Sequence, residues 1–413
     1  KSKSRPPSPP GSSAEGCADH LVVVGVLGLT KNQSLKMNVS ASQPLKILVV
    51  HASHTGGHAA AAGALADELN QHDGVQADSV NLLSVTSAEA QQANLRSHSF
   101  VSKRFPGLRK LGFDLAFSGN KLACGIAGLA LDWKASRADE MLAEIERRQP
   151  DVIVATHSVT ARYLEYWTNQ GKISAPVHCV PTDFRTHRMW KQDCVQHYYV
   201  APGGSRQDLI DFGVAPEKIH ETGIPIRPPV ASGLNQADLR AKLGLVPDKP
   251  VVLISGGSLG LQPFTMLVKE LRKRPEDFQI VCIAAKNEKA RQELEELPQT
   301  GQPLHVTGLV NNMSEWIEAS DIILTKPGGL TCSEILAQKK PMVFAQLYEG
   351  LETPLIQRLV ESGVAVAGPT AEATAAAVGN LFASPQRLQS MRDRAEQLSR
   401  PDSTETIAHY LLS

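Results

Sequence analysis

The feature that most constrains the fold is a repeated unit, in which a short apolar run leads through a turn into a helical segment. Near the start, "LKILVV" at 45–50 precedes "AAAAGALADELN" at 59–70, and the pattern restarts with "PVVLISGGS" at 250–258. An apolar run without polar alternation is typical of a strand covered on both faces. Because strands that alternate with helices form parallel sheets, the sequence predicts an α/β protein.

A proline-rich stretch divides the repeated units into two groups. "GIPIRPPV" at 223–230 carries three prolines, which suit neither a helix nor the interior of a sheet. We therefore expect two doubly wound, Rossmann-like domains with a cleft between them. The expected divisions are a disordered extension at 1–44, a first domain at 45–225, a second domain at 226–382 and C-terminal helices at 383–413.

Charge and cysteine usage exclude some classes of partner. Lys and Arg together number 42, as do Asp and Glu, so the whole chain offers no basic field to nucleic acid. Its six cysteines form no CxxC pair, as is typical of a reduced compartment. The apolar run at 21–29 is far shorter than the roughly 20 residues of a spanning helix. These features predict a cytoplasmic protein without a spanning segment or a nucleic-acid partner.

Three glycine turns follow predicted strands and precede predicted helices, at 55–57, 255–260 and 325–331. Glycine lets a backbone approach a phosphate closely, and the N–H groups that begin the next helix can bind it. A single such turn is weak evidence, because glycine also serves packing at many strand ends. Three of them, spread over both expected domains, indicate an anionic ligand in the cleft.

His58 follows the first glycine pair, Gly56 and Gly57, at the start of a predicted helix. The positive end of the helix dipole disfavours the imidazolium, which keeps the imidazole available as a base. The alternative is that His58 only caps the helix.

A second polar segment, "VPTDFRTHRMW" at 180–190, places Asp183, His187 and Trp190 after another predicted strand. The alternative is a solvated loop with an Asx turn at Asp183. Nearby histidines and cysteines raise the question of zinc: His178, His187, His197, Cys179 and Cys194. Their spacing fits no closed zinc site, so we expect no metal.

A basic and aromatic segment at 101–131 has the composition of a surface that contacts a bilayer. Apolar groups suit the acyl boundary and cations suit anionic head groups. The candidate membrane residues are Lys103, Arg104, Phe105, Arg109, Lys110, Phe113 and Phe117. The alternative is a pair of core helices with a basic outer face. Peripheral association with an anionic membrane surface is the prediction.

Five motifs, in order, resemble the family of monogalactosyldiacylglycerol synthases and diacylglycerol glucosyltransferases. They are "TGGHAAAAGAL", "PTDFRTHRMW", "KIHETGIPI", "VLISGGSLG" and "TKPGGLTCSEIL" with "PMVF". That family is related to the transferase that adds N-acetylglucosamine to lipid I. The resemblance implies the GT-B fold, two facing Rossmann-like domains with a C-terminal helix that crosses back to the first. "SPQRLQSMRDRAEQLS" at 384–399 is the candidate for that helix.

The resemblance also implies that the second domain binds a UDP-sugar. The two later glycine turns would bind the diphosphate, Glu334 the ribose, Gly308–Val310 the uracil, and Glu352 the sugar. The donor-binding set is Gly256, Gly257, Ser258, Gly308, Leu309, Val310, Lys326, Pro327, Gly328, Gly329, Leu330, Thr331, Glu334 and Glu352. Because helix N-termini suit a diphosphate, no metal or other cofactor is required.

By the same resemblance, the first domain would hold a diacylglycerol acceptor for inverting transfer of galactose or glucose. His58 would be the base, and Asp183 its partner or an alternative base. The residues expected to line the acceptor side are Gly56, Gly57, His187 and Trp190.

One loop departs from the family. Gly350 and Glu352 are present, but Leu351 and Leu355 stand where relatives carry Gln and Asn, so the sugar stays open. A same-fold enzyme with a polyprenyl-linked or soluble acceptor is the main alternative. More distant alternatives are a UDP-sugar epimerase, a lipid or nucleotide sensor, and a dinucleotide-dependent oxidoreductase that uses Asp78 for a ribose.

Overall fold

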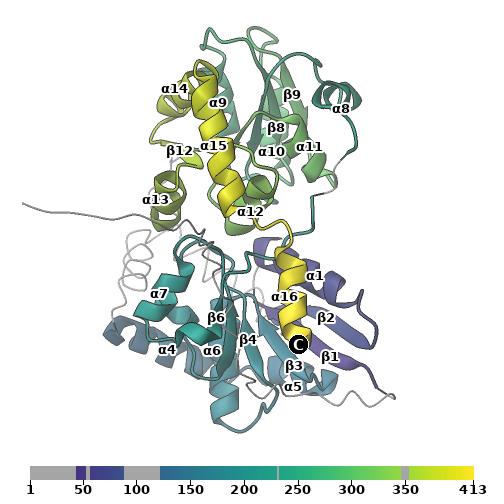
Figure 1. Cartoon of the computed structure of the whole chain (residues 1–413), viewed down its shortest axis with the longest axis vertical. Coiled ribbons are helices and arrows are strands. Elements are labelled where there is room, and N and C mark those ends of the chain that lie inside the picture. Colours follow the sequence, from purple (N-terminus) through teal and green to yellow (C-terminus); the bar gives the residue numbers. More distant parts are fainter. Residues whose placement is uncertain (1–42, 53–55, 88–120, 230–231, 346–352) are drawn as a thin grey trace, which may run out of the picture. The chain divides into compact units, whose positions relative to one another are not determined.

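The computed structural model describes residues 43–52, 56–87, 121–229, 232–345 and 353–413. The expected extension at 1–44 therefore lies almost wholly outside the described residues. Within them, two six-stranded parallel sheets confirm the α/β prediction (Figure 1). The first, ordered β2-β1-β3-β4-β5-β6, contains β1 (Leu45–His51), β2 (Val75–Asn81), β3 (Val152–Ala155), β4 (Val177–Cys179), β5 (Val195–Tyr199) and β6 (Ile219–His220). The second, ordered β12-β11-β10-β7-β8-β9, contains β7 (Val251–Ser255), β8 (Gln279–Ile283), β9 (Leu304–Thr307), β10 (Ile322–Thr325), β11 (Met342–Ala345) and β12 (Ala365–Gly368).

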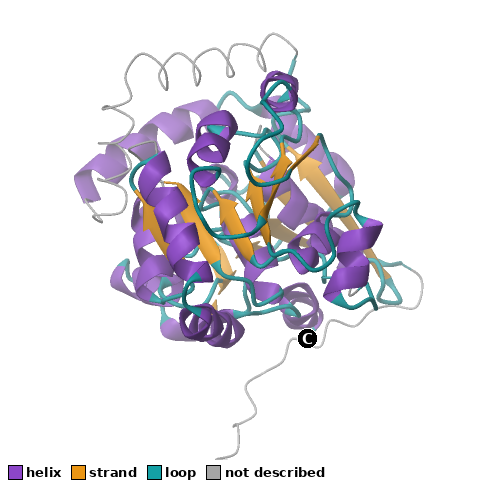
Figure 2. Ribbon diagram, turned by 90° about the horizontal axis from the view of Figure 1, so that it is seen from above, coloured by secondary structure: helices purple, strands orange, loops and turns teal. Residues whose placement is uncertain are grey.

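Helices flank the strands of both sheets (Figure 2). In the first half of the chain they are α1 (Gly56–Leu69), α4 (Lys121–Ala135), α5 (Asp139–Arg148), α6 (Ser158–Asn169) and α7 (Ser205–Asp211), with the short 3-10 helices η1 (Arg188–Trp190) and η2 (Pro216–Lys218). In the second half they are α8 (Gln236–Lys242), α9 (Phe264–Leu271), α10 (Glu288–Glu295), α11 (Met313–Ala319), α12 (Gly329–Ala337), α13 (Thr353–Glu361), α14 (Ala371–Phe382), α15 (Pro385–Leu398) and α16 (Ser403–Leu412).

Alternate residues of the central strands pack into different cores, which explains their uninterrupted apolar character. In β1, Ile47 and Val49 belong to one hydrophobic cluster, whereas Leu48 and Val50 belong to another. Successive side chains of a strand point to opposite faces, so both faces of this sheet are covered. Residues 47–50 stay apolar because each of these four side chains loses contact with water.

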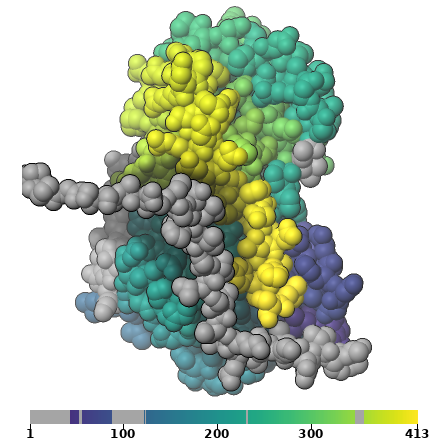
Figure 3. All heavy atoms as spheres, in the orientation of Figure 1, coloured from purple at the N-terminus to yellow at the C-terminus, as the bar shows by residue number. Residues whose placement is uncertain are grey.

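The helix that returns to the first half of the chain is α16, and not the predicted segment at 384–399. That segment forms α15, and its Leu388 and Met391 pack in a core of the second half. By contrast, α16 packs beside α1 (Figure 3), with Ile407, Ala408 and Leu411 in the β1 and α1 core. The apolar residues of α15 therefore cover a surface of the second half.

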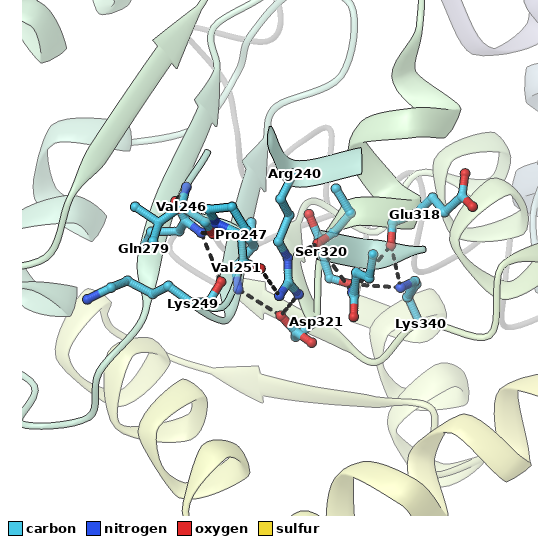
Figure 4. A network of polar contacts seen from close by, with 12 residues as sticks. Arg240, Val246, Pro247, Lys249, Val251, Gln279, Glu318, Ser320, Asp321 and Lys340 are labelled. Carbon is cyan, nitrogen blue, oxygen red and sulfur yellow. Dashed lines mark hydrogen bonds and ion pairs between the residues drawn. The ribbon is translucent and has the colours of Figure 1, made fainter. Parts of the chain in front are cut away.

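A polar network fixes the amino ends of two central strands of the second sheet (Figure 4). The carboxylate of Asp321 accepts hydrogen bonds from the N–H of Val251 and from the Arg240 guanidinium, both at 2.7 Å. Lys340 donates to the carbonyl oxygens of Glu318, near the end of α11, and of Ser320, which follows that helix. Burial lowers the pKa of Lys340 to about 8. The network holds β7 and β10 in register, and the glycine turns follow the opposite ends of these strands.

Candidate functional site

His58 lies in the first turn of α1 and is held through one ring nitrogen. Its Nδ1 is 2.8 Å from the carbonyl oxygen of Thr156 and 2.7 Å from the Oγ1 of Thr182. A carbonyl oxygen can only accept, so Nδ1 carries the proton in the neutral ring. Nε2 then keeps its lone pair, and it has no hydrogen-bond partner within the described residues. This tautomer fits a base that accepts a proton at Nε2.

Three further histidines surround His58 and are held neutral. Burial is the main cause, and the His58 imidazole adds to it. Together they lower the pKa of His157 to about 3 and those of His51 and His187 to about 4. The His157 ring packs edge-on against His58 at 4.6 Å, and its Nδ1 accepts the N–H of Val159.

Sequence reasoning missed His51 and His157. The available signal was that His51 ends the first strand and that His157 follows "VIVAT" two residues after β3. Because β1 and β3 are paired parallel neighbours, their carboxyl ends meet at the same edge of the sheet. The order of strands, which the sequence did not give, is what brings the two histidines together.

Asp183 follows Thr182 in a turn beyond β4, as the sequence placed it. Burial raises the pKa of its carboxyl group, and the nearby His58 opposes this effect. Its side chain has no hydrogen bond within the described residues, whereas its backbone oxygen accepts one from Ser205. A carboxyl group without a partner beside an imidazole is available to a ligand or to a proton.

Trp190 does not line this site. It ends η1, is 1% exposed and belongs to the hydrophobic core between the first sheet and α6. The prediction that Trp190 lines the acceptor side is therefore wrong. It treated the segment as an open loop because the neighbouring residues are polar. A single large aromatic side chain can still anchor such a segment in the core.

The first glycine turn meets the second across the fold, and the third glycine turn meets the polar segment. A Cβ added to Gly56 would lie 2.8 Å from the Oγ of Ser258. A Cβ added to Gly329 would overlap the carbonyl oxygen of Thr182. The start of α1, the turn after β7, the start of α12 and the turn after β4 therefore lie together, and His58 and Asp183 are among them.

The turn after β7 needs its glycines. Gly257 has φ of +70°, a conformation that residues with a side chain rarely adopt. A Cβ on Gly256 would lie 2.5 Å from the backbone nitrogen of Leu261. The side chain of Lys326 lies over this turn, with its Cε 3.1 Å from the Cβ position of Gly257. Its ammonium group has no hydrogen bond or ion pair among the described residues, so backbone N–H groups and one cation face the same region.

Glu334 and Gly308–Val310 complete the predicted donor set within the described residues. Glu334 lies on α12, and burial raises its pKa to about 7 against the opposing charge of Arg227. The carboxyl group of Glu334 has no hydrogen bond or ion pair with any of the described residues. Gly308–Val310 follow β9, and Leu309 is 64% exposed.

Other predicted residues lie outside the described residues. They are Glu352 with Leu351 of the sugar loop, and the membrane set Lys103, Arg104, Phe105, Arg109, Lys110, Phe113 and Phe117. The described end of the basic segment forms α4, and it exposes an apolar stripe: Leu122, Ile126, Leu129 and Trp133 are 59–76% exposed. Across the described ranges, no helix is long and apolar enough to cross a membrane. Nor does that part of the chain contain a cluster of three or more His, Cys, Asp or Glu residues suited to a metal.

Solved structures share this fold. Staphylococcus aureus MnaA in a co-structure with UDP matches with a TM-score of 0.58 and 15% identity, over 89% of this chain and 96% of that one. MurG from Acinetobacter baumannii matches with a TM-score of 0.55 and 16% identity, over 89% and 99% of the two chains. Two Rossmann-like halves with these relatives define a GT-B protein.

Sequence comparisons then identify the family. The monogalactosyldiacylglycerol (MGDG) synthase model matches residues 58–226, and the glycosyltransferase family 28 C-terminal domain matches 251–407. A processive diacylglycerol beta-glucosyltransferase of Bacillus pumilus is 29% identical over 88% of this chain and 93% of its own length. Another, from Staphylococcus aureus, is 30% identical over 64% of this chain and 68% of its own length. The chain belongs to this family of diacylglycerol glycosyltransferases and is a glycosyltransferase.

Proposed function

We propose that this enzyme transfers a hexose from a UDP-sugar to the hydroxyl group of diacylglycerol, with inversion at the anomeric carbon. The observation that carries the proposal is the meeting of the His58 imidazole with the glycine turns of the second half. The names of the family's members support diacylglycerol as acceptor.

The reaction is one displacement at the anomeric carbon. The acceptor oxygen forms a bond to that carbon while the bond from carbon to the diphosphate oxygen breaks, and the electron pair leaves with UDP. Nε2 of His58 accepts the proton of the acceptor hydroxyl. Asp183, next to the imidazole, favours the imidazolium that results. His187 stays neutral beside them on the acceptor side.

The second half would bind the donor. Backbone N–H groups at Gly256–Ser258 and at the start of α12, with Pro327, Leu330 and Thr331 around them, would hold the diphosphate. Lys326 adds a positive charge, so these groups stabilise the leaving UDP without a metal ion. The unpaired Glu334 would accept both ribose hydroxyl groups. Gly308–Val310 would contact the uracil, and Glu352 the hexose.

The acceptor is a membrane lipid, so the enzyme has to reach a bilayer surface. The stripe on α4 offers apolar side chains one and two turns apart, and in the sequence α4 directly follows the basic residues at 101–120. Together they fit peripheral binding to an anionic membrane from its cytoplasmic side.

Separate incubations with UDP-glucose, UDP-galactose and UDP-N-acetylglucosamine test the function. Each contains vesicles of diacylglycerol in phosphatidylglycerol, and lipids are identified by mass spectrometry. We expect a hexosyl-diacylglycerol from one of the first two donors. Matched vesicles with a polyprenyl phosphate-linked sugar in place of diacylglycerol are the control. Product from those vesicles alone would refute the acceptor, and a free hexose epimer would indicate an epimerase.

A further inference from the structure

Thr182 meets His58 at the nitrogen that does not take part in proton transfer. The Oγ1 of Thr182 is 2.7 Å from Nδ1, and the carbonyl oxygen of Thr156 is 2.8 Å from the same atom. If the hydroxyl group donated to an unprotonated Nδ1, the lone pair of that nitrogen would face the Thr156 oxygen. The arrangement without repulsion is an Nδ1–H shared by both oxygens.

We infer that Thr182 is a positioning residue for His58, an inference that rests on the proposed function. The carbonyl oxygen of Thr156 selects the tautomer that leaves Nε2 free, and the hydroxyl group of Thr182 fixes the orientation of the ring. It also stabilises the imidazolium, because Nδ1–H becomes a stronger donor when Nε2 is protonated. In many enzymes a carboxylate contacts the distal nitrogen of such a base. Here two uncharged oxygens take that place.

The backbone of Thr182 makes a second contact that gives this residue a wider role. Its carbonyl oxygen abuts the Cα of Gly329, the first residue of α12. Thr182 is 4% exposed, so neither contact can be replaced by water without local rearrangement. One residue therefore sets the position of the base relative to the turn that would hold the diphosphate.

Two substitutions separate the hydroxyl group from the rest of the side chain. Thr182→Val keeps the shape and removes the oxygen, whereas Thr182→Ser keeps the oxygen. The matched control is Thr186→Val in the same segment. Thr186 is fully buried, and its hydroxyl group has no partner within the described residues. We expect T182V to lower kcat on the order of tenfold, which is the rate change that corresponds to the loss of one hydrogen bond of about 1.4 kcal/mol. KM for the UDP-sugar should be unchanged, and T182S and T186V should retain kcat.

A spectroscopic readout does not depend on activity. The full-length protein is labelled with ¹⁵N-histidine, and the Nδ1–H resonance of His58 is assigned from its loss in His58→Gln. We expect this resonance to move upfield in T182V and to keep its position in T186V. An unchanged resonance together with an unchanged kcat would overturn the inference. If T182V does not fold, Thr182→Ala takes its place in both measurements. If the wild type forms no glycolipid, the proposed function fails, while the resonance still tests the contact.

Discussion

The carbonyl oxygen of Thr182 lies so close to Gly329 that a Cβ at position 329 would be only 1.9 Å away. The contact joins the carbonyl oxygen of Thr182 to the Cα of Gly329. Both are backbone atoms, so no flexible side chain can move aside. The contact joins the turn after β4 to the start of α12, two segments that are more than 140 residues apart in the sequence.

Gly329→Ala is expected to destabilise the protein by about 1 to 3 kcal/mol, the usual cost of overpacking. Gly328→Ala is the matched control, because its Cβ would meet nothing within 4 Å and its φ of −83° suits alanine. Urea unfolding of the ligand-free protein measures both. Equal stability of the two variants would contradict the contact. G328A should still weaken UDP binding, because its methyl group enters the proposed diphosphate site.

His58→Ala should lower the transfer rate by roughly 100-fold or more, the usual contribution of a general base. His58→Asn tests the role more sharply, because its side-chain N–H can replace Nδ1–H toward Thr156 while Nε2 is lost. We expect H58N to fold and bind UDP like the wild type and to be as inactive as H58A. Calorimetry and the lipid assay measure the two properties. Substantial activity in H58N would remove His58 as the base.

Glu334 predicts a pH dependence of donor binding. Burial raises its pKa to about 7, so the carboxyl group is protonated below that pH and ionised above it. The ionised form accepts hydrogen bonds from the ribose, so affinity for UDP-glucose should rise from pH 6 to pH 8. Glu334→Gln should bind roughly 10- to 100-fold more weakly at pH 8 and lose this slope. The ligand for calorimetry is UDP-glucose because, unlike UDP, it has no terminal phosphate that would itself titrate in this pH range. A slope that persists in E334Q would assign the dependence to another group.

The apolar stripe of α4 predicts vesicle binding. Ile126→Glu with Leu129→Glu removes two side chains that would each contribute about 1.5 to 3 kcal/mol when buried in lipid. We expect the double variant to lose most sedimentation with phosphatidylglycerol vesicles. Leu234→Glu with Val246→Glu is the control, since both residues are exposed apolar positions in the second half. Neutralising Lys103, Arg104, Arg109 and Lys110 should also weaken binding. Unchanged sedimentation in both α4 and basic-segment variants would exclude this surface.

The sequence predicted what depends on local pattern. The apolar runs of β1 and β7 lie where expected, and so do the glycine turn before α12 and the helix that begins beside His58. Each is encoded within about ten neighbouring residues, by periodicity and by glycine placement.

What the sequence could not predict depends on which segments meet. The contacts of Thr182 with His58 and Gly329 join three distant segments, and no local pattern encodes them. Trp190 looked like part of an open loop because its neighbours are polar, yet its own surface decides its burial. The segment at 384–399 was the candidate for the helix that returns to the first half, but α16 occupies that position.

The neutral histidines around His58 restrict where a transferred proton can go. His51, His157 and His187, with pKa values of about 3 to 4, cannot take it from the imidazolium. It leaves through the Asp183 carboxyl group, whose pKa burial raises, or goes to water or to the departing nucleotide. Each catalytic cycle therefore ends with a deprotonation of the His58 ring that no neighbouring imidazole can relay.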